Sequence, residues 1–390
     1  MEKNNYKKLN FKISDEEFKL RIKKITDKMA EENLELLILS GDEFAQGYIR
    51  YVSDYRPILE NALVLIGVNG ESLLLCGPEC KTLAFNTSRI KNIKVCSDVA
   101  IPGEDYPNEE MVSLMEILKE YESKNKINRI GVADLDFIPN FLINSITKVN
   151  IGKDIINSAN IINKIRGVKS KEEIVLLKGL YESSIKSCKR GLENLDVGKT
   201  ETEIAAEISY PLWKMGAEQM SHTFLVASGI NTTSALMFPS GDKVIKEGDL
   251  VILDIGAVYK GYYSDIATTK IIGKGGKDKE KVLNIVRKAK ESAIKKIKPG
   301  IKGKEIDLAA REITSNAGYG KNHLYGVCHG VGLQHCEYPF FGPNSETIVE
   351  EGMFFTVDIG LFNFEFGGVR LEDGIVVKGG GCEVFTIEED

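Results

Sequence analysis

The stretch Glu247–Gly256 reads EGDLVILDIG, and the second half of the chain is organised around it. Apolar residues lead from a glycine-containing turn into Asp254, which Ile-Gly follows. A second strand-like run carries Asp265, after a short link that contains Gly261. Because glycine readily adopts a positive φ, this link predicts a hairpin turn between two antiparallel strands.

The turn can be centred at two places, and both lead to the same chemistry. With Lys260 and Gly261 at its centre, it pairs Asp254 with Ala267, so that Asp265 lies one diagonal step away. A turn centred one residue earlier makes the two aspartates direct partners. In either register both carboxylates lie on one face, since side chains alternate along a strand. Like charges this close are unfavourable unless a cation or a shared proton holds them, and a divalent metal ion is the economical explanation.

The same pattern occurs a second time. Glu351–Gly360 reads EGMFFTVDIG and carries Asp358 in the place of the first aspartate, and the strand-like run after it carries Glu372. Between the two copies, the motif Cys328–Leu333 supplies an imidazole, that of His329. Two such hairpins predict a pseudo-symmetric site. Four carboxylates with one imidazole suit a pair of divalent ions such as Mn, Co, Zn or Fe.

Together these motifs resemble those of the metallopeptidase family of Xaa-Pro aminopeptidases, prolidases and methionine aminopeptidases. The resemblance is good from about Ile161 to the end and weaker before that point. The phrases that carry it are Val226–Gly229, Leu253–Gly256, Ser264–Asp265, His329–Leu333 and Gly368–Asp373. The family implies a pita-bread catalytic domain with a two-metal site, and creatinase is a relative that uses this fold without catalytic metal. The family's five ligand positions fall on Asp254, Asp265, His329, Asp358 and Glu372.

Size and composition bound the remaining expectations. A chain of 390 residues exceeds the usual single core, so two domains are expected. We expect an α+β protein, with a creatinase-like N-terminal α/β domain over residues 1–160 and a pseudo-symmetric pita-bread domain with a curved antiparallel sheet over residues 161–390. A net charge of −6 argues against a nucleic-acid partner. The polar first residues, the absence of a long apolar run and seven scattered cysteines predict a cytoplasmic protein without a membrane span or a disulfide framework.

Helix and strand signals fit this division. Ser14 is the expected N-cap of a helix over residues 15–31, and strands are expected at 34–39, 62–66, 72–76 and 130–132. Capping boxes at Ser170 and Thr200 open helices that run to about residues 192 and 215. Further helices are expected over residues 279–296 and 304–316.

One departure from the family concerns Asp358, where the family usually has glutamate. In the family this residue also takes the proton of the attacking water, so the resemblance implies a shorter catalytic base and an altered metal pair. Arg370 lies two residues before Glu372 and shares its face, where a cation can hold the charge and geometry of the carboxylates. We place Arg370 in the substrate-binding wall.

The histidines depart further. The peptidases have one histidine shortly after the Ala-Ser-Gly phrase, where this chain has Met237 and Phe238, and another at the position of Cys336. Those histidines hold the substrate carbonyl and donate the leaving-group proton. His335 lies one position early, so on a regular strand it faces away from the pocket unless a bulge turns it back. His222 either returns an imidazole from another wall or is a satisfied, partly buried histidine. We treat His222 and His335 as candidate catalytic residues. Met237, Phe238 and Cys336 are candidate substrate-binding residues.

Two further expectations concern side chains near the site. Cys336 is expected to be a small buried filler, with a reactive thiol as the alternative. His323, on the loop before the ligand histidine, is expected to be solvated.

The leading hypothesis is a metal-dependent hydrolase that acts on a short peptide or another small C–N substrate, with the Xaa-Pro peptidases as the nearest activity. Alternatives are a creatinase-like amidinohydrolase, a metal-dependent lyase such as dimethylsulphoniopropionate lyase, or a catalytically silent binding protein. The retained ligands argue against a protein without catalytic activity, and the lost histidines argue for one. We further expect a homodimer, a small-molecule or peptide substrate, and neither a nucleic-acid nor a membrane partner.

Overall fold

The computed structural model describes residues 6–124, 127–133, 135, 138–149, 154–222 and 225–387. Contacts divide the chain into two compact units, Ile13–Arg166 and Gly167–Asp390, with Met1–Lys12 belonging to the second. The boundary predicted between residues 160 and 161 lies inside the helix that precedes the second unit, α6 (Ala159–Gly167). Among the described helices, none combines the length and the apolar character that crossing a membrane requires.

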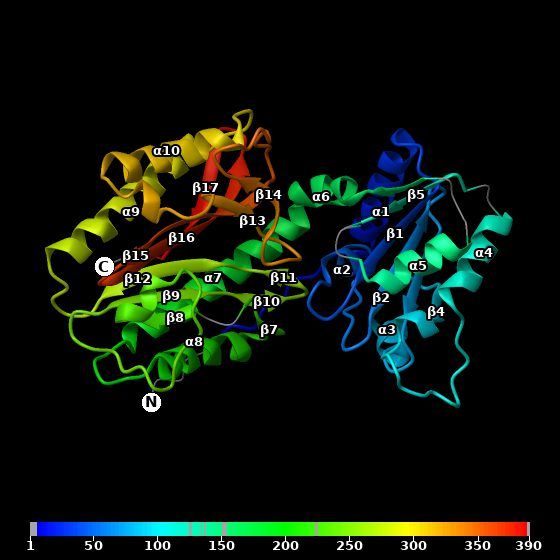
Figure 1. The fold of residues 1–390 in the computed structure, drawn as a ribbon, viewed down its shortest axis with the longest axis horizontal. Helices are drawn as coiled ribbons and strands as arrows, with labels where there is room; N and C mark the ends of the chain where they lie inside the picture. The colour runs from blue at the N-terminus through cyan, green and yellow to red at the C-terminus, as the bar shows by residue number, and fades with distance from the viewer. Residues whose placement is uncertain are drawn as a thin grey trace. The chain divides into compact units, whose positions relative to one another are not determined.

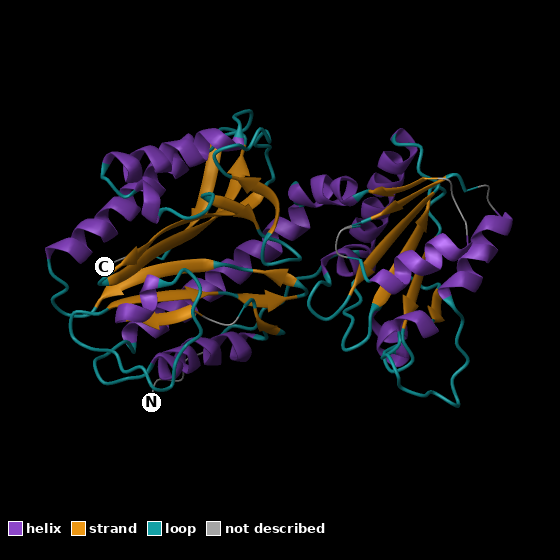
Figure 2. Ribbon diagram, in the orientation of Figure 1, coloured by secondary structure: helices purple, strands orange, loops and turns teal. Residues whose placement is uncertain are grey.

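The first unit is built on a six-stranded mixed sheet with the strand order β4-β3-β2-β1-β5-β6 (Figures 1 and 2). Its strands are β1 (Leu36–Gly41), β2 (Ala62–Gly67), β3 (Ser72–Cys76), β4 (Ile93–Val95), β5 (Arg129–Val132) and β6 (Asp154–Asn157). Its other helices are α1 (Asp15–Glu31), α2 (Gly47–Ser53), α3 (Lys81–Thr87), α4 (Leu114–Lys124) and α5 (Asn140–Val149). The hairpin predicted from residues 62–66 and 72–76 is confirmed as the antiparallel pair β2 and β3. Apolar residues of α4 and α5 share one buried cluster with those of the sheet.

The second unit contains an eight-stranded sheet with the order β14-β13-β15-β16-β12-β9-β8, to which β17 adds by pairing with β16, and a smaller sheet with the order β11-β10-β7. The strands before the histidine motif are β7 (Gln219–Met220), β8 (Leu225–Ser228), β9 (Leu250–Ile255), β10 (Ala257–Tyr259), β11 (Tyr262–Tyr263) and β12 (Ile266–Ile271). The later strands are β13 (Cys328–Gly330), β14 (Glu337–Phe341), β15 (Phe354–Phe364), β16 (Gly367–Lys378) and β17 (Gly381–Phe385). The pairings within the large sheet are antiparallel, as the predicted fold class requires.

Two helix pairs flank this sheet (Figure 1). They are α7 (Lys171–Glu193) with α8 (Glu201–Met215), and α9 (Lys277–Lys296) with α10 (Gly303–Asn316). Both predicted capping boxes are confirmed. The side chains of Ser170 and Thr200 each accept a hydrogen bond from the backbone N–H of the glutamate three residues later, and the side chain of that glutamate accepts one from the backbone N–H of the capping residue. An N-cap of this kind contributes about 1 kcal/mol. Apolar residues of α9 and α10 pack into the cluster that includes the buried face of β15 and β16.

The first hairpin has the first of the two predicted registers. Lys260 and Gly261 form its turn with φ values of 51° and 78°, and Asp254 pairs with Ala267. The strands are interrupted at Gly256, where an added Cβ would lie 1.8 Å from the backbone oxygen of Ser264. The chain therefore leaves the large sheet after β9, forms the small hairpin of β10 and β11, and returns as β12.

Candidate metal centre

The two hairpins bring four carboxylates to the floor of one cavity. Asp254 on β9 pairs with Ala267 on β12, and Asp358 on β15 pairs with Glu372 on β16. Ala267 also pairs with Glu372, which joins the two hairpins side by side. Asp265 lies between β11 and β12, just before the strand that carries Ala267. All four carboxylates are buried and line a cavity of about 680 Å³.

The fifth predicted ligand, His329, reaches the same cavity from β13. Its Nε2 atom lies 3.6 Å from Oδ2 of Asp265 and 3.6 Å from Oε1 of Glu372. Possible ligand atoms of these three residues all lie within 4.8 Å of one another. A divalent ion bound by two carboxylates and an imidazole is chemically ordinary for Mn, Co, Zn and Fe.

The other two predicted ligands, Asp254 and Asp358, are both engaged by Arg370. Its Nη1 atom donates to Oδ2 of Asp254, and its Nε atom lies 3.4 Å from Oδ1 of Asp358. Arg370 is buried. Its contacts agree with the prediction that a cation on the same strand face as Glu372 holds the carboxylates. Tyr325, which sequence reasoning missed, donates to Oδ1 of Asp358 at 3.0 Å and accepts from Nε of Arg370 at 3.1 Å. It lies outside a regular strand, and only its place four residues before His329 links it to a motif.

Burial and mutual repulsion shift the pKa values of the carboxylates. Burial raises the pKa of Asp265 well above its usual range, and the charges of Glu372 and Asp254 act in the same direction. Burial also raises the pKa of Asp358 to about 7, against the guanidinium of Arg370. For Asp254 burial acts the same way, but Arg370 and His222 outweigh it and lower the pKa. Without a bound cation, the site therefore holds protons on some of its acids.

These residues fit a bound metal. Among the residues that the structure describes, Oδ1 of Asp254, Oδ1 of Asp265 and Oε1 of Glu372 are buried and have no hydrogen-bond partner. A buried carboxylate oxygen without a donor is costly, and a cation satisfies it. The three oxygens all belong to predicted ligands, so the donor set matches the group that the sequence predicted.

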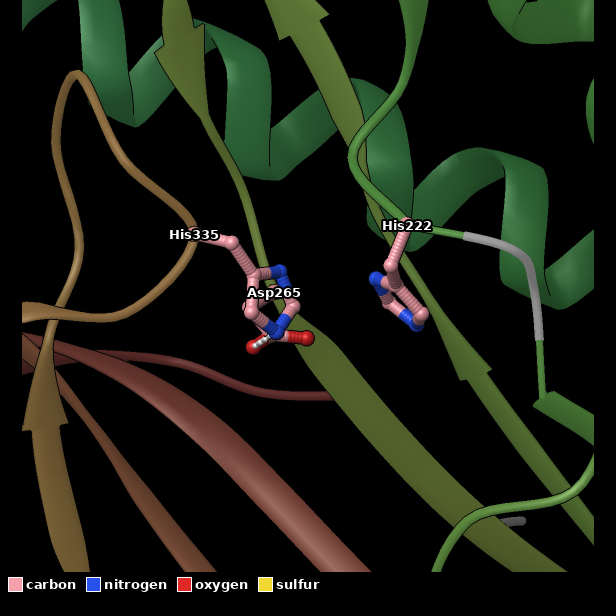
Figure 3. A group of neighbouring side chains, drawn as sticks. All are labelled: His222, Asp265 and His335. Atoms are coloured by element: carbon pink, nitrogen blue, oxygen red, sulfur yellow. Dashed lines mark ion pairs between the residues drawn. The ribbon is translucent and has the colours of Figure 1, made fainter. Parts of the chain in front are cut away.

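The structure decides between the two orientations predicted for His335. On a regular strand it would face away, but residues 331–336 belong to no strand, and the pairing of β13 with β14 shifts register after His329. Strand alternation therefore does not apply, and Nε2 of His335 lies 3.1 Å from Oδ2 of Asp265. His222 enters from the segment after β7, with its ring centre 4.7 Å from that of His335 (Figure 3).

Two smaller expectations were wrong. Cys336 is exposed rather than a buried filler, although it does line the cavity. His323 is buried rather than solvated, and its Nδ1 atom lies 3.2 Å from Oγ1 of Thr314 on α10. Burial, helped by the charge of Arg311, lowers the pKa of His323 to about 4, so this imidazole is neutral in the folded protein. Its sequence position on a loop gave no signal of the helix that covers it.

The remaining predicted contacts lie on the walls of the cavity. Met237 and Phe238 line it from the loop between β8 and β9, and Phe340 lines it from β14. Phe238 is 73% exposed and Phe340 is 54% exposed, so both present apolar surface to whatever enters.

Comparison with known proteins agrees with this geometry. The profile of the metallopeptidase family M24 matches residues 181–379, and that of the creatinase/prolidase N-terminal domain matches residues 21–168. An Xaa-Pro dipeptidase from Pyrococcus horikoshii is 30% identical over 372 residues, which cover 95% of this chain and 97% of that protein. The crystal structure of the prolidase from the same organism has a TM-score of 0.81 at 28% identity, covering 95% of this chain and 99% of the other. An X-Pro aminopeptidase structure from Thermotoga maritima has a TM-score of 0.82 at 26% identity, covering 94% and 98%.

A curved antiparallel sheet with buried carboxylates and an imidazole at its centre defines a metal-dependent hydrolase of the pita-bread type. The chain belongs to the metallopeptidase family M24 and carries a creatinase-like N-terminal domain. Membership of this family implies that the chain binds a divalent metal.

Proposed function

We propose that this protein hydrolyses a C–N bond in a short peptide, with Xaa-Pro bonds as the first substrate class. The observation that carries the proposal is the group of buried carboxylates with unsatisfied oxygens at the floor of an open cavity. The Pyrococcus horikoshii Xaa-Pro dipeptidase, which matches almost its whole length to this chain, supports the choice of substrate class.

The proposal includes two divalent ions, drawn from Mn, Co, Zn and Fe, and held by the five predicted ligands. These are Asp254, Asp265, His329, Asp358 and Glu372. When bound, such ions polarise a carbonyl oxygen and lower the pKa of water to near neutrality. The chain itself supplies a base in Asp358, the residue to which the family resemblance assigns the proton of the attacking water. Tyr325 and Arg370 hold that carboxylate in place.

The imidazoles needed on the substrate side come from new positions. The stretch Leu236–Phe238 and Cys336 stand where the resemblance places the family's two histidines, whereas His222 and His335 line the same cavity. These two histidines place imidazoles on the substrate side of the metal centre. Arg370, at the cavity floor, is the cation available to a substrate carboxylate.

The apolar wall indicates what the substrate carries. Leu236, Phe238 and Phe340 are all more than half exposed and all line the cavity. A proline ring or a large apolar side chain would cover this surface and gain about 25 cal/mol for each Å² removed from water. We therefore expect peptides with bulky apolar residues to bind better than those with small or polar residues.

A substrate panel tests the proposal. Metal-loaded protein is assayed on Xaa-Pro dipeptides with apolar, small and charged Xaa residues, beside the Pyrococcus horikoshii enzyme, with metal-free protein as the control. We expect metal-dependent release of proline, about a hundredfold slower than in that relative, because losing a positioned acid or polarising group costs about that much. Phe238→His should raise the rate. The absence of any peptide hydrolysis by protein that holds its metal would contradict the proposal.

A second candidate is hydrolysis of a different C–N substrate, as in a creatinase-like amidinohydrolase. The observation that favours it is the loss of both family histidines, within Leu236–Phe238 and at Cys336. Release of urea or ammonia from guanidino compounds in the same panel distinguishes the two. We also propose a homodimer and a cytoplasmic location, which size-exclusion chromatography with light scattering and cell fractionation test.

A further inference from the structure

A second group of possible metal ligands lies beside the five predicted ones. It consists of His222, Asp265 and His335, and possible ligand atoms of the three lie within 4.8 Å of one another. Figure 3 shows that the three side chains come from three separate segments and gather at one point, with Asp265 beneath the ring of His335 and His222 beside them. Asp265 also belongs to the group with His329 and Glu372, so it lies between two candidate ion positions.

Each imidazole of this group faces a buried carboxylate. Nε2 of His335 lies 3.1 Å from Oδ2 of Asp265, and Nε2 of His222 lies 3.4 Å from Oδ1 of Asp254. Both aspartates are 3% exposed or less. Each has an Oδ1 atom without a hydrogen-bond partner within the described part of the chain. Two imidazoles and the two aspartates of the first hairpin therefore meet at one side of the cavity.

The local structure around His222 fixes which of its nitrogens faces the carboxylates. Nδ1 of His222 lies 2.8 Å from Oγ of Ser221, and Nε2 lies 3.2 Å from the backbone oxygen of Asp254 and 3.4 Å from its Oδ1. Ser221 can approach because position 256 is glycine, where an added Cβ would lie 2.3 Å from that Oγ atom. A hydrogen bond to the second nitrogen is the usual way in which a protein orients a histidine that binds metal.

The loop that carries His335 is also held in place. Glu337 forms a buried ion pair with Lys169 at 2.9 Å and accepts from the backbone of Gln334 at 3.2 Å. Gly332 is required at its position, because an added Cβ would lie 2.2 Å from Oε1 of Glu337. Tyr263, two residues before Asp265, donates its backbone N–H to the backbone oxygen of Gly332 at 2.7 Å. The loop that carries His335 is thus hydrogen-bonded to the hairpin that carries Asp254 and Asp265.

We propose that His222 and His335, together with Asp254 and Asp265, bind a divalent ion on the side of the first hairpin. Two imidazoles and two carboxylates form a donor set that favours Zn, Co or Ni over Mn or Mg, because imidazole binds the later metals more strongly. The position defined by Asp265, His329 and Glu372 has only one imidazole and is less selective. The inference rests on the metal centre of the proposed function and is independent of its substrate.

The test is a metal titration of protein stripped with a chelator. Wild type and the double variant His222→Asn/His335→Asn are loaded with Co²⁺ or Mn²⁺, and bound metal is measured by elemental analysis and calorimetry. Wild type should retain two Co²⁺ per chain and the double variant one, with the second dissociation constant raised at least about a hundredfold. Mn²⁺ at the second position should be weak in both proteins. The visible spectrum of bound Co²⁺ should also lose the component that belongs to the second equivalent.

Matched variants separate ligation from local damage. Asp249→Asn, which alters a carboxylate paired with Lys243 outside the cavity, should still bind two Co²⁺, and Ser221→Ala should weaken the second ion about tenfold. If the double variant does not fold, as judged by circular dichroism, the single variant His335→Asn replaces it, with the same expected loss. A folded variant that keeps both ions at wild-type affinity overturns the inference. Peptide assays on the same samples are scored separately, so that two ions without hydrolysis would contradict only the proposed function.

Discussion

The two hairpins begin from nearly the same sequence and end with different chemistry. In the second, β15 and β16 pair along their length, and Asp358 lies directly opposite Glu372. In the first, the strands break at Gly256, so that Asp265 lies outside a strand and is offset from Asp254. The repeat therefore sets the topology, and local interruptions of it set the positions of the acids.

The surroundings of the hairpins differ as well. Two histidines, His222 and His335, face the aspartates of the first hairpin. Asp358 of the second hairpin instead faces the phenol of Tyr325 and the guanidinium of Arg370. Imidazoles thus flank the aspartates of the first hairpin and a phenol flanks Asp358, while Arg370 contacts an aspartate of each hairpin. We expect the first side to control metal affinity and the second side to control the rate of the chemical step.

The largest effect is expected at Asp265, because both candidate ion positions share it. Asp265→Asn keeps the shape of the side chain and removes its charge. We expect both ions to be lost and kcat/KM to fall by more than about a thousandfold, since the ions supply the Lewis acid. Elemental analysis of folded protein measures the loss. Asp249→Asn, in the turn before β9, is the matched control, since Asp249 pairs with Lys243 outside the cavity. Two ions retained by Asp265→Asn would show that the two positions do not share a ligand.

A comparison of Asp254→Ala with Asp358→Glu comes next. Asp254→Ala removes a charged ligand from the first hairpin, so its ion should bind about a hundredfold more weakly. Asp358→Glu keeps the charge and restores the family's usual length, so metal affinity should stay within about tenfold of wild type or increase. Metal titration measures both, and circular dichroism confirms folding. If folded Asp358→Glu loses metal, the site has been rebuilt around the shorter acid.

The buried side chain of His323 should make the free energy of unfolding depend on pH. The folded-state pKa of His323 is about 4, below its ordinary value of 6.5. The unfolded chain takes up a proton that the folded chain excludes, so His323 contributes stability that is present above pH 6.5 and is lost as the pH falls toward 4. Between pH 7 and pH 4.5, metal-free wild type should lose about 2 kcal/mol more than His323→Gln. Urea unfolding at the two pH values measures this, and equal losses would place His323 in a solvated state.

The sequence predicted the features that neighbouring residues determine better than those that depend on residues far away in the chain. The helices capped by Ser170 and Thr200 were predicted correctly, because neighbouring residues determine them, and the register centred at Lys260 and Gly261 is one of the two that were predicted. The residues at the floor of the cavity followed from the repeated hairpin. The choice between the two orientations predicted for His335 and the burial of His323 could not be made from the sequence, since each depends on a distant group, the Lys169–Glu337 ion pair in one case and α10 in the other.

Tyr325 was missed for a related reason. It has no periodic pattern and no motif spacing of its own, and its role depends on Asp358 and Arg370, which are 33 and 45 residues away in the sequence. Its contribution is also the smallest that we expect to measure.

Tyr325→Phe removes one hydroxyl and should separate positioning from metal binding. The phenol donates to Asp358 at 3.0 Å and accepts from Arg370 at 3.1 Å, so its loss leaves the carboxylate less firmly oriented. A neutral hydrogen bond of this kind contributes about 1 kcal/mol, and one to a charged group about twice that. We therefore expect kcat to fall about tenfold with KM and metal content unchanged, and the acidic limb of the pH profile to move. Tyr319→Phe, which removes a hydroxyl elsewhere in the same unit, should leave kcat unchanged. Loss of an ion in Tyr325→Phe, with kcat restored by excess metal, would instead show that Tyr325 acts by orienting Asp358 as a metal ligand, and would remove the division between the two hairpins.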